Sequence, residues 1–246
     1  MQNTESNSAY QWLDSENNFE NTMGKIVVFG EKYAGGNLTN TEHILRKVAN
    51  ILSIVFHPMM MPIYAMLFLL YGHTMWSMLP AYYKTITLIQ IGVATCLLPL
   101  ASISILVAMG YVGDPEMPNK SERVLPLGIS SIIIGVACFY MHLKAELPFP
   151  LIRMSDGMFV MMIVSMCISS VWKISLHGMG VGALLVFVCV VGITSCIDFS
   201  MPACVTFAIA GTVAWARMYL DAHTPTQLLV GFLLGTGCML FAMLHP

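Results

Sequence analysis

The sequence predicts an all-α fold, a polytopic bundle of about six to seven transmembrane helices. Of its 246 residues, 57% are hydrophobic and only 10% are charged, and the mean hydropathy is +0.75. Soluble domains carry about 25% charged residues, so a chain this apolar cannot cover a water-facing surface. A lipid bilayer accepts apolar side chains on the outside of a protein whose backbone polar groups are bonded internally, as they are in helices.

Seven hydrophobic segments are long enough, or nearly long enough, to cross a bilayer. They are residues 51–71, 85–111, 127–143, 157–172, 178–197, 202–216 and 225–244. His57-Pro58 and Pro62 interrupt the first segment, which favours an interfacial piece followed by a short span. The Pro148-Phe149-Pro150 sequence predicts a turn between the third and fourth segments.

The N-terminal part of the chain has a different composition. Residues 1–45 are polar and acidic, and we expect them to be disordered or interfacial. Residues 43–50 are predicted to form an amphipathic lead-in to the transmembrane domain, which we place at residues 46–246.

Charge and cysteine usage narrow the possible partners. The net charge of −2 disfavours a nucleic-acid partner. The seven cysteines lie almost entirely within or beside apolar segments and show no metal-ligand spacing with one another, so we interpret them as small buried hydrophobic residues. We therefore expect no metal or other cofactor. The oligomeric state is left open, because Gly231 and Gly235 could pack helices within one chain or between chains.

The alternation of spans places three loops on one side of the membrane. Loops 112–126, 172–177 and 217–224 are separated by pairs of segments, so all three face the same side. They carry a concentration of basic residues, namely Lys120, Arg123, Arg217, His177 and His223. A basic residue at a helix end commonly extends to the lipid headgroups, and a single interfacial histidine is commonly structural. Their convergence in a chain with few charges favours a functional interpretation.

This combination of side chains suits phosphoryl transfer. Arginine binds phosphate oxygens through two parallel hydrogen bonds, and lysine adds a point charge. One histidine can attack phosphorus while the other protonates the leaving oxygen, without any metal. Thr224 and Pro225 are typical residues for the N-cap and first turn of a helix. They place His223 at a helix N-terminus, where an anion is favoured.

The third loop resembles the last signature of the type 2 phosphatidic acid phosphatase superfamily. That signature is Ser-Arg, five residues, His, three residues and Asp. Here Arg217 and His223 match it, while Ala216 replaces the serine and Gln227 replaces the aspartate. The segment Ile174-Ser175-Leu176-His177 is similar to the family's Pro-Ser-Gly-His. Lys120, Arg123 and Pro126 resemble its first signature, at a shorter spacing.

The resemblance implies a membrane enzyme that hydrolyses a lipid phosphate or diphosphate monoester. By this comparison, His223 is the nucleophile that forms a phosphohistidine, and His177 is the general acid. Phosphate binding would fall to Lys120, Arg123, Arg217, Ser175 and Gly178. Gln227 could orient His223 through its carbonyl, without the negative charge of an aspartate. Asp221 could replace that aspartate, or it could simply pair with Arg217.

Two alternatives follow from these departures. Retention of both histidines and both arginines favours a working phosphatase. Gln227 and the altered first signature favour a catalytically impaired relative that binds or transports a phosphorylated lipid. The family suggests a multi-pass protein of the cell inner membrane whose active face is periplasmic. Lys25, Lys32, Arg46 and Lys47 lie on the same side as that face, and by the positive-inside rule they favour the cytoplasm instead.

Overall fold

The computed structural model describes residues 40–111, 120–143 and 147–245, without the side chains of residues 120–123. The chain divides into two units, Met1–Leu45 and Arg46–Pro246, and the boundary falls inside the first described helix.

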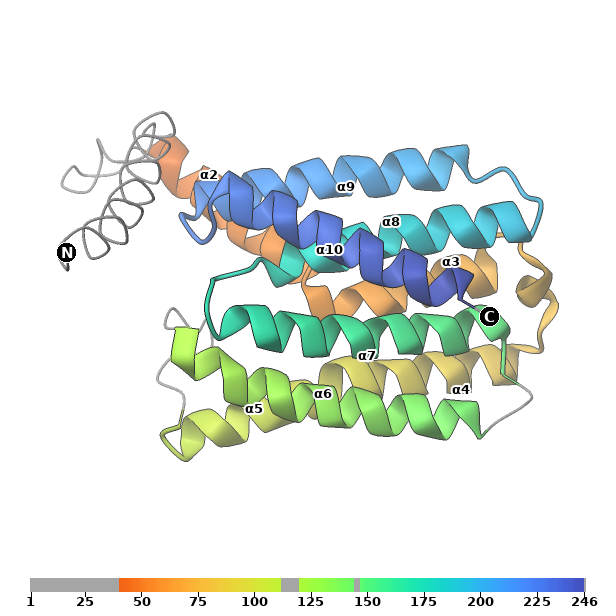
Figure 1. The fold of residues 1–246 in the computed structure, drawn as a ribbon. Helices are drawn as coiled ribbons and strands as arrows, with labels where there is room; N and C mark the ends of the chain where they lie inside the picture. The colour runs from red at the N-terminus through yellow and green to blue at the C-terminus, as the bar shows by residue number, and fades with distance from the viewer. Residues whose placement is uncertain (1–39, 112–119, 144–146, 246) are drawn as a thin grey trace, which may run out of the picture. The chain divides into compact units, whose positions relative to one another are not determined.

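Every regular element in the described residues is helical (Figure 1). The α-helices are α2 (Asn40–Val55), α3 (Met61–Tyr71), α4 (Ala81–Gly92), α5 (Leu98–Ala108), α6 (Lys120–His142), α7 (Phe149–Ser169), α8 (Leu176–Thr194), α9 (Ser200–Tyr219) and α10 (Pro225–Leu244). Short 3-10 turns, η2 (Pro58–Met60) and η3 (Met75–Met78), flank α3, and a π-helical turn, η4 (Val93–Leu97), joins α4 to α5.

The predicted polytopic helix bundle is confirmed. Within the described residues, seven helical stretches are long and apolar enough to cross a membrane. Two of them are composite: α2 with α3, and α4 with α5. Many large apolar side chains on the outer surfaces are exposed, as expected for contact with lipid; Ile132, Phe139 and Phe207 are examples.

Proline explains both breaks in the composite spans. The chain leaves helical geometry at His57, and Pro58 and Pro62 occupy the first turns of η2 and α3. Pro99 in the first turn of α5 cannot donate to the Thr95 carbonyl four residues earlier, and the π turn occurs at this point. The expected break at His57-Pro58 is therefore a kink between two helical pieces.

Several expected boundaries differ from the structure, and three of these differences are explained by the local sequence or bear on the site. Helix α7 begins at Phe149, eight residues before the predicted fourth segment, because Pro148 is its N-cap and Pro150 fits its first turn. Helix α9 continues to Tyr219, so Arg217 lies in its last turn, where a cation is favoured by the helix dipole. Helix α6 begins at Lys120, so residues 120–126, expected in a loop, are helical.

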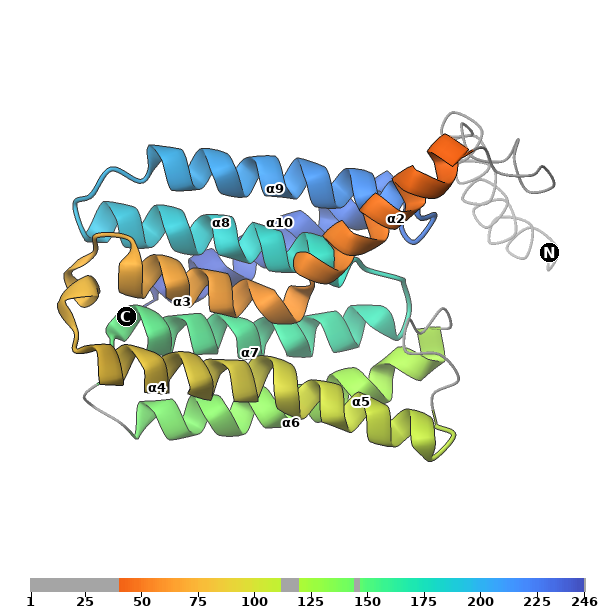
Figure 2. The same cartoon turned by 180° about the vertical axis from the view of Figure 1, so that it is seen from behind.

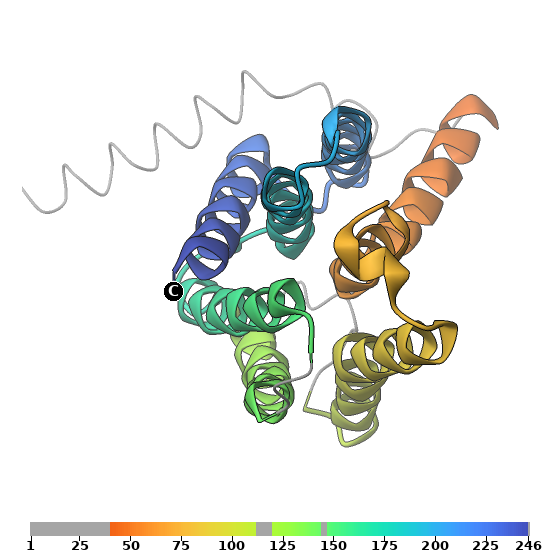
Figure 3. The ribbon, with the colours of Figure 1, turned by 90° about the vertical axis from the view of Figure 1, so that its right-hand side faces the viewer.

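Helix α8 lies at the centre of the bundle. Of its spanning window, 67% is buried, against 17–39% in the other six spans. Seen along the helices, α8 lies between α9 and α10 (Figure 3), and from behind α3 runs beside it (Figure 2). Phe187, Val181 and Val191 of α8 are fully buried in the main hydrophobic core.

Helices α8 and α10 pack with their backbones in contact. A Cβ at Gly178 or Gly182 of α8 would overlap the backbone of α10, and one at Gly231 or Gly235 would overlap the backbone of α8. Small residues spaced four apart on both helices permit this approach. Gly231 and Gly235 therefore pack two helices of the same chain, which answers the question that the sequence left open for these two residues.

The helix directions bring the expected loops to one end of the second unit. The C-terminal ends of α7 and α9 and the N-terminal ends of α8 and α10 lie together at the left of Figure 1. Helix α6 begins at this end as well. This end carries the candidate site.

Candidate functional site

A cavity of about 610 Å³ opens inside the bundle. This is within the range of roughly 300–1,000 Å³ that is typical of small-molecule sites. At the end where the loops meet, its lining is polar, with Asn50, Ser53, His57, His177, Arg217 and His223. Deeper in the bundle it is apolar, with residues such as Ala65, Met154, Met158, Leu184, Phe187 and Met239. The cavity therefore joins a cluster of basic groups to an apolar pocket.

His223 is held by the N-terminal cap of α10. Thr224 and Gln227 form a capping box: Gln227 N donates to Thr224 Oγ1 over 3.3 Å, and Thr224 N donates to Gln227 Oε1 over 3.2 Å. The second bond needs an acceptor, which identifies the Gln227 side-chain atom on this side as oxygen. His223 Nδ1 lies 3.3 Å from the same oxygen.

This contact decides the tautomer of the His223 ring. An amide oxygen only accepts hydrogen bonds, so Nδ1 must carry the proton and donate it to Gln227. In the neutral ring the lone pair is then on Nε2. The Gln227 oxygen thus accepts a hydrogen bond from the His223 ring, and its orienting role in catalysis stays a prediction.

His177 is buried at the start of α8, the second residue after the N-cap Ser175. Its Nε2 lies 3.2 Å from the Ser53 carbonyl oxygen. A carbonyl oxygen only accepts, so Nε2 is the donor, and Nδ1 is the ring atom that can exchange a proton. The Ser53 hydroxyl, which also lines the cavity, is buried and has no hydrogen-bond partner among the described residues.

A third histidine, which the sequence analysis did not select, completes the cluster. His57 and His177 pack edge to face, with ring centroids 5.4 Å apart and an interplanar angle of 81°. His57 Nδ1 accepts from Met59 N over 3.3 Å as the cap of η2. The sequence showed His57-Pro58 only as a helix break. The kink brings the His57 ring into the cavity, and hydropathy carries no signal for that.

Among the described residues that line the cavity, Arg217 is the one with a permanently charged basic side chain. It lies in the last turn of α9 and is close enough to interact electrostatically with both His57 and His177. The side chains of Lys120 and Arg123 lie outside the described residues. Their backbone forms the first turn of α6, and Pro126, one turn later in that helix, lines the cavity.

Asp221 lies next to a residue that sequence reasoning did not pair with it. Its Oδ2 is 3.8 Å from Arg46 Nη2 on α2, and the two side chains are 72% and 48% exposed. Neither expected arrangement, replacement of the family aspartate or an ion pair with Arg217, is the one observed. Asp221 adopts a left-handed backbone conformation, with φ of 52°, in the turn between α9 and α10.

Ser175 and Gly178, expected to bind phosphate, have structural roles instead. Ser175 Oγ accepts from Gly178 N over 3.3 Å and caps α8, and Ser175 is fully buried. Gly178 packs on the backbone of α10. Neither residue lines the cavity among the described residues, so we leave both out of the site.

Known proteins offer no further guide to this site. Comparison of the chain with protein-family models, with curated proteins and with solved structures found no match. The interpretation of the site therefore depends on its own geometry and chemistry.

Proposed function

We propose that this multi-pass membrane protein is a lipid phosphatase that acts through a phosphohistidine on His223. The observation that carries the proposal is the hydrogen bond from His223 Nδ1 to Gln227 Oε1, at the polar end of an otherwise apolar cavity. A histidine nucleophile needs its lone pair on the attacking nitrogen, and this bond leaves it on Nε2. Simple binding of a phosphate has no such requirement.

The chemistry would proceed in two steps. His223 Nε2 attacks phosphorus, the bond from phosphorus to the leaving oxygen breaks, and His177 gives a proton to that oxygen. Water then attacks the phosphohistidine and gives a proton back to His177, the bond between phosphorus and nitrogen breaks, and phosphate leaves as His223 returns to its neutral form. Arg217 would stabilise the charge on the phosphoryl oxygens in both transition states. The proton that His177 gives up and takes back would be the one on Nδ1, because Nε2 donates its own proton to the Ser53 carbonyl.

The shape of the cavity supports a lipid substrate. The apolar part of the lining, with Ala65, Leu184 and Phe187 among its residues, would accept a hydrocarbon chain while the phosphate stays among the basic groups. We propose a lipid phosphate or diphosphate monoester, such as a polyprenyl diphosphate or a phosphatidyl phosphate.

Phosphate release by the purified protein tests this proposal. The assay uses detergent solution with a metal chelator and a panel of polyprenyl diphosphate, phosphatidate and phosphatidylglycerophosphate. We expect release from at least one of these lipids, and we expect His223→Ala to abolish it. Thr226→Ala is a matched control, since Thr226 is exposed in the same turn. Equal release by His223→Ala and the unaltered protein would refute the phosphohistidine.

The second candidate is a protein that binds or transports a phosphorylated lipid without turnover. The neutral side chain of Gln227 favours it, because loss of the orienting carboxylate in a catalytic triad costs about 10⁴ in rate. Under this alternative, no lipid of the panel releases phosphate, but a fluorescent phosphatidate analogue binds to the folded protein. Arg217→Ala would then weaken binding, and His223→Ala would retain it.

We further propose that the protein lies in the cell inner membrane with the polar end of the cavity facing the periplasm. Cys196 lies exposed in the turn between α8 and α9, at the opposite end of the bundle (Figure 1). In a variant with Cys196 as its single cysteine, a membrane-impermeant maleimide should therefore leave intact cells unlabelled and react after permeabilisation. Labelling in intact cells would place the polar end of the cavity on the cytoplasmic side.

A further inference from the structure

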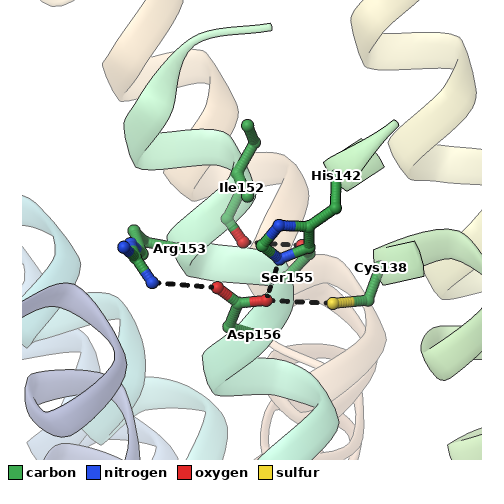
Figure 4. Close-up of polar contacts among 6 residues, drawn as sticks. All are labelled: Cys138, His142, Ile152, Arg153, Ser155 and Asp156. Carbon is green, nitrogen blue, oxygen red and sulfur yellow. Dashed lines mark hydrogen bonds and ion pairs between the residues drawn. The ribbon is translucent and has the colours of Figure 1, made fainter. Parts of the chain in front are cut away.

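Three side chains with metal-binding atoms face one another at the other end of the bundle. Cys138 and His142 lie one turn apart on α6, and Asp156 faces them from α7 (Figure 4). The thiol sulfur, an imidazole nitrogen and a carboxylate oxygen all lie within 4.8 Å of one another. The phosphate chemistry proposed above uses none of these residues.

The distances converge on a single oxygen. His142 Nε2 lies 2.7 Å from Asp156 Oδ1, and Cys138 Sγ lies 3.0 Å from the same atom. Tetrahedral zinc, with bonds of about 2.0–2.3 Å, would separate these ligand atoms by roughly 3.3–3.6 Å. Small rotations of the side chains would open that space without any movement of the helices.

Arg153 already holds the other oxygen of the carboxylate. Its Nη1 lies 3.6 Å from Asp156 Oδ2 (Figure 4). Its guanidinium carbon lies over the Phe149 ring, 4.7 Å from the ring centroid. Metal-bound carboxylates commonly have such a second partner, which fixes their orientation. Arg153 leaves Oδ1 directed at the cysteine and the histidine.

We propose that Cys138, His142 and Asp156 bind a zinc ion. A mixed set of sulfur, nitrogen and oxygen ligands suits Zn²⁺ better than Mg²⁺ or Ca²⁺, which prefer oxygen. On binding, the Cys138 thiol releases its proton to water, and the neutral His142 ring moves its proton from Nε2 to Nδ1. Zinc would then bond to the thiolate, to Nε2 and to Oδ1, with a water molecule as the fourth ligand.

The burial of the three residues fits such a site. Cys138 is buried, whereas His142 is exposed and its side chain is 48% accessible. The ion would thus enter from the solvent side at the end of α6. A bound ion would fasten α6 to α7.

The sequence alone indicates two of the three proposed ligands. Cysteine and histidine four residues apart lie on one face of a helix, a spacing that can bind metal. The third ligand, Asp156, comes from the next helix, α7, and spacing along the chain does not reveal it. A search for ligand pairs among the cysteines alone overlooks this site.

Cobalt titration of the purified full-length protein in detergent, prepared metal-free, tests the proposal. We expect one equivalent of Co²⁺ to bind with a thiolate-to-cobalt charge-transfer band, and Zn²⁺ to displace it. Cys138→Ser should remove the band, and His142→Ala and Asp156→Asn should each weaken binding at least tenfold. Cys196→Ser is the matched control: this exposed thiol lies in another turn, and its loss should change nothing.

The competing explanation is a plain ion-pair network that ties α6 to α7. In that case the three variants would leave cobalt binding, if there is any, unchanged, and the proposal would be overturned. The His142 side chain is half exposed, so we expect His142→Ala to fold like the unaltered protein. Zn²⁺ should raise the unfolding temperature of the unaltered protein and leave that of His142→Ala unchanged. These measurements do not involve phosphate release, so they stand whether or not the proposed phosphatase activity is found.

Discussion

Gly235 of α10 lies directly on the backbone of Met179 in α8. A Cβ on Gly235 would overlap the Met179 carbonyl oxygen, and Gly231, one turn earlier, meets the Ser175 carbonyl in the same way. At the end of this contact Ser175 N donates to the Gln227 carbonyl oxygen over 3.4 Å. The glycines therefore set the spacing between the two helix N-termini that carry His177 and His223.

Replacement of Gly235 by alanine should destabilise the bundle. The added methyl group must push α10 away from α8, and overpacking of this kind costs about 1–3 kcal/mol. Gly237→Ala is the control on the same helix, because a Cβ there meets nothing within 4 Å. Thermal unfolding in detergent should show a lower midpoint for Gly235→Ala, while Gly237→Ala stays near the unaltered protein. Equal midpoints would mean that the two helices can separate at little cost.

The spans and the placement of the loops could be predicted from the sequence. Long apolar segments have few structural alternatives in a bilayer, and alternation of direction then brings Arg217, His177 and His223 to one end. The cap of α10 was also predictable, since Thr224 and Pro225 have strong positional preferences.

Other parts of the site depend on side-chain contacts between distant segments, and no local pattern shows these. His57 reaches the cavity through a kink, and Asp221 pairs with Arg46, far away in the sequence. Ser175 matched a phosphate-binding motif by type, yet its hydroxyl is used to cap α8. Motif resemblance identifies a residue type, whereas its partner is set by the packing of whole helices.

Asp221→Asn should leave phosphate release within about twofold of the unaltered protein. Asp221 pairs with Arg46 at the surface, and exposed ion pairs contribute about 0–1 kcal/mol. Asparagine tolerates the left-handed backbone at this position, so the turn should keep its shape. Steady-state kinetics on the best lipid of the panel would check this. A tenfold drop in turnover would show that the carboxylate of Asp221 acts on His223 during the reaction.

Ala65→Leu should shorten the lipid chain that the protein accepts. Ala65 is buried in the apolar part of the cavity lining, and a leucine there would fill space that the hydrocarbon chain of the proposed substrate would occupy. We expect KM for a long-chain phosphatidate to rise at least tenfold, with little change for a short-chain, water-soluble analogue. Ala208→Leu, on the exposed surface of α9, is the control. A parallel loss with both substrates would indicate a chain bound elsewhere.

Gln227→Glu should raise turnover, and Gln227→Leu should lower it. A glutamate oxygen can accept the same two hydrogen bonds, from His223 Nδ1 and Thr224 N, and it adds a negative charge that stabilises the imidazolium formed during hydrolysis. We expect kcat to rise about tenfold or more, toward the range of enzymes with an orienting carboxylate. Leucine removes both acceptors; it should cost about 10²-fold or more in kcat and about 1 kcal/mol in helix stability.

The separation of kcat from KM identifies what Gln227 does. If it orients the nucleophile, both variants change kcat while KM for the lipid stays nearly constant, because the ring acts on phosphorus only in the transition state. If Gln227 serves only as the cap of α10, glutamate should behave like the unaltered protein, and leucine should lower the unfolding temperature without a selective effect on kcat. With that pair of results, the tautomer of His223 would no longer support a phosphatase, and the lipid-binding alternative would be favoured.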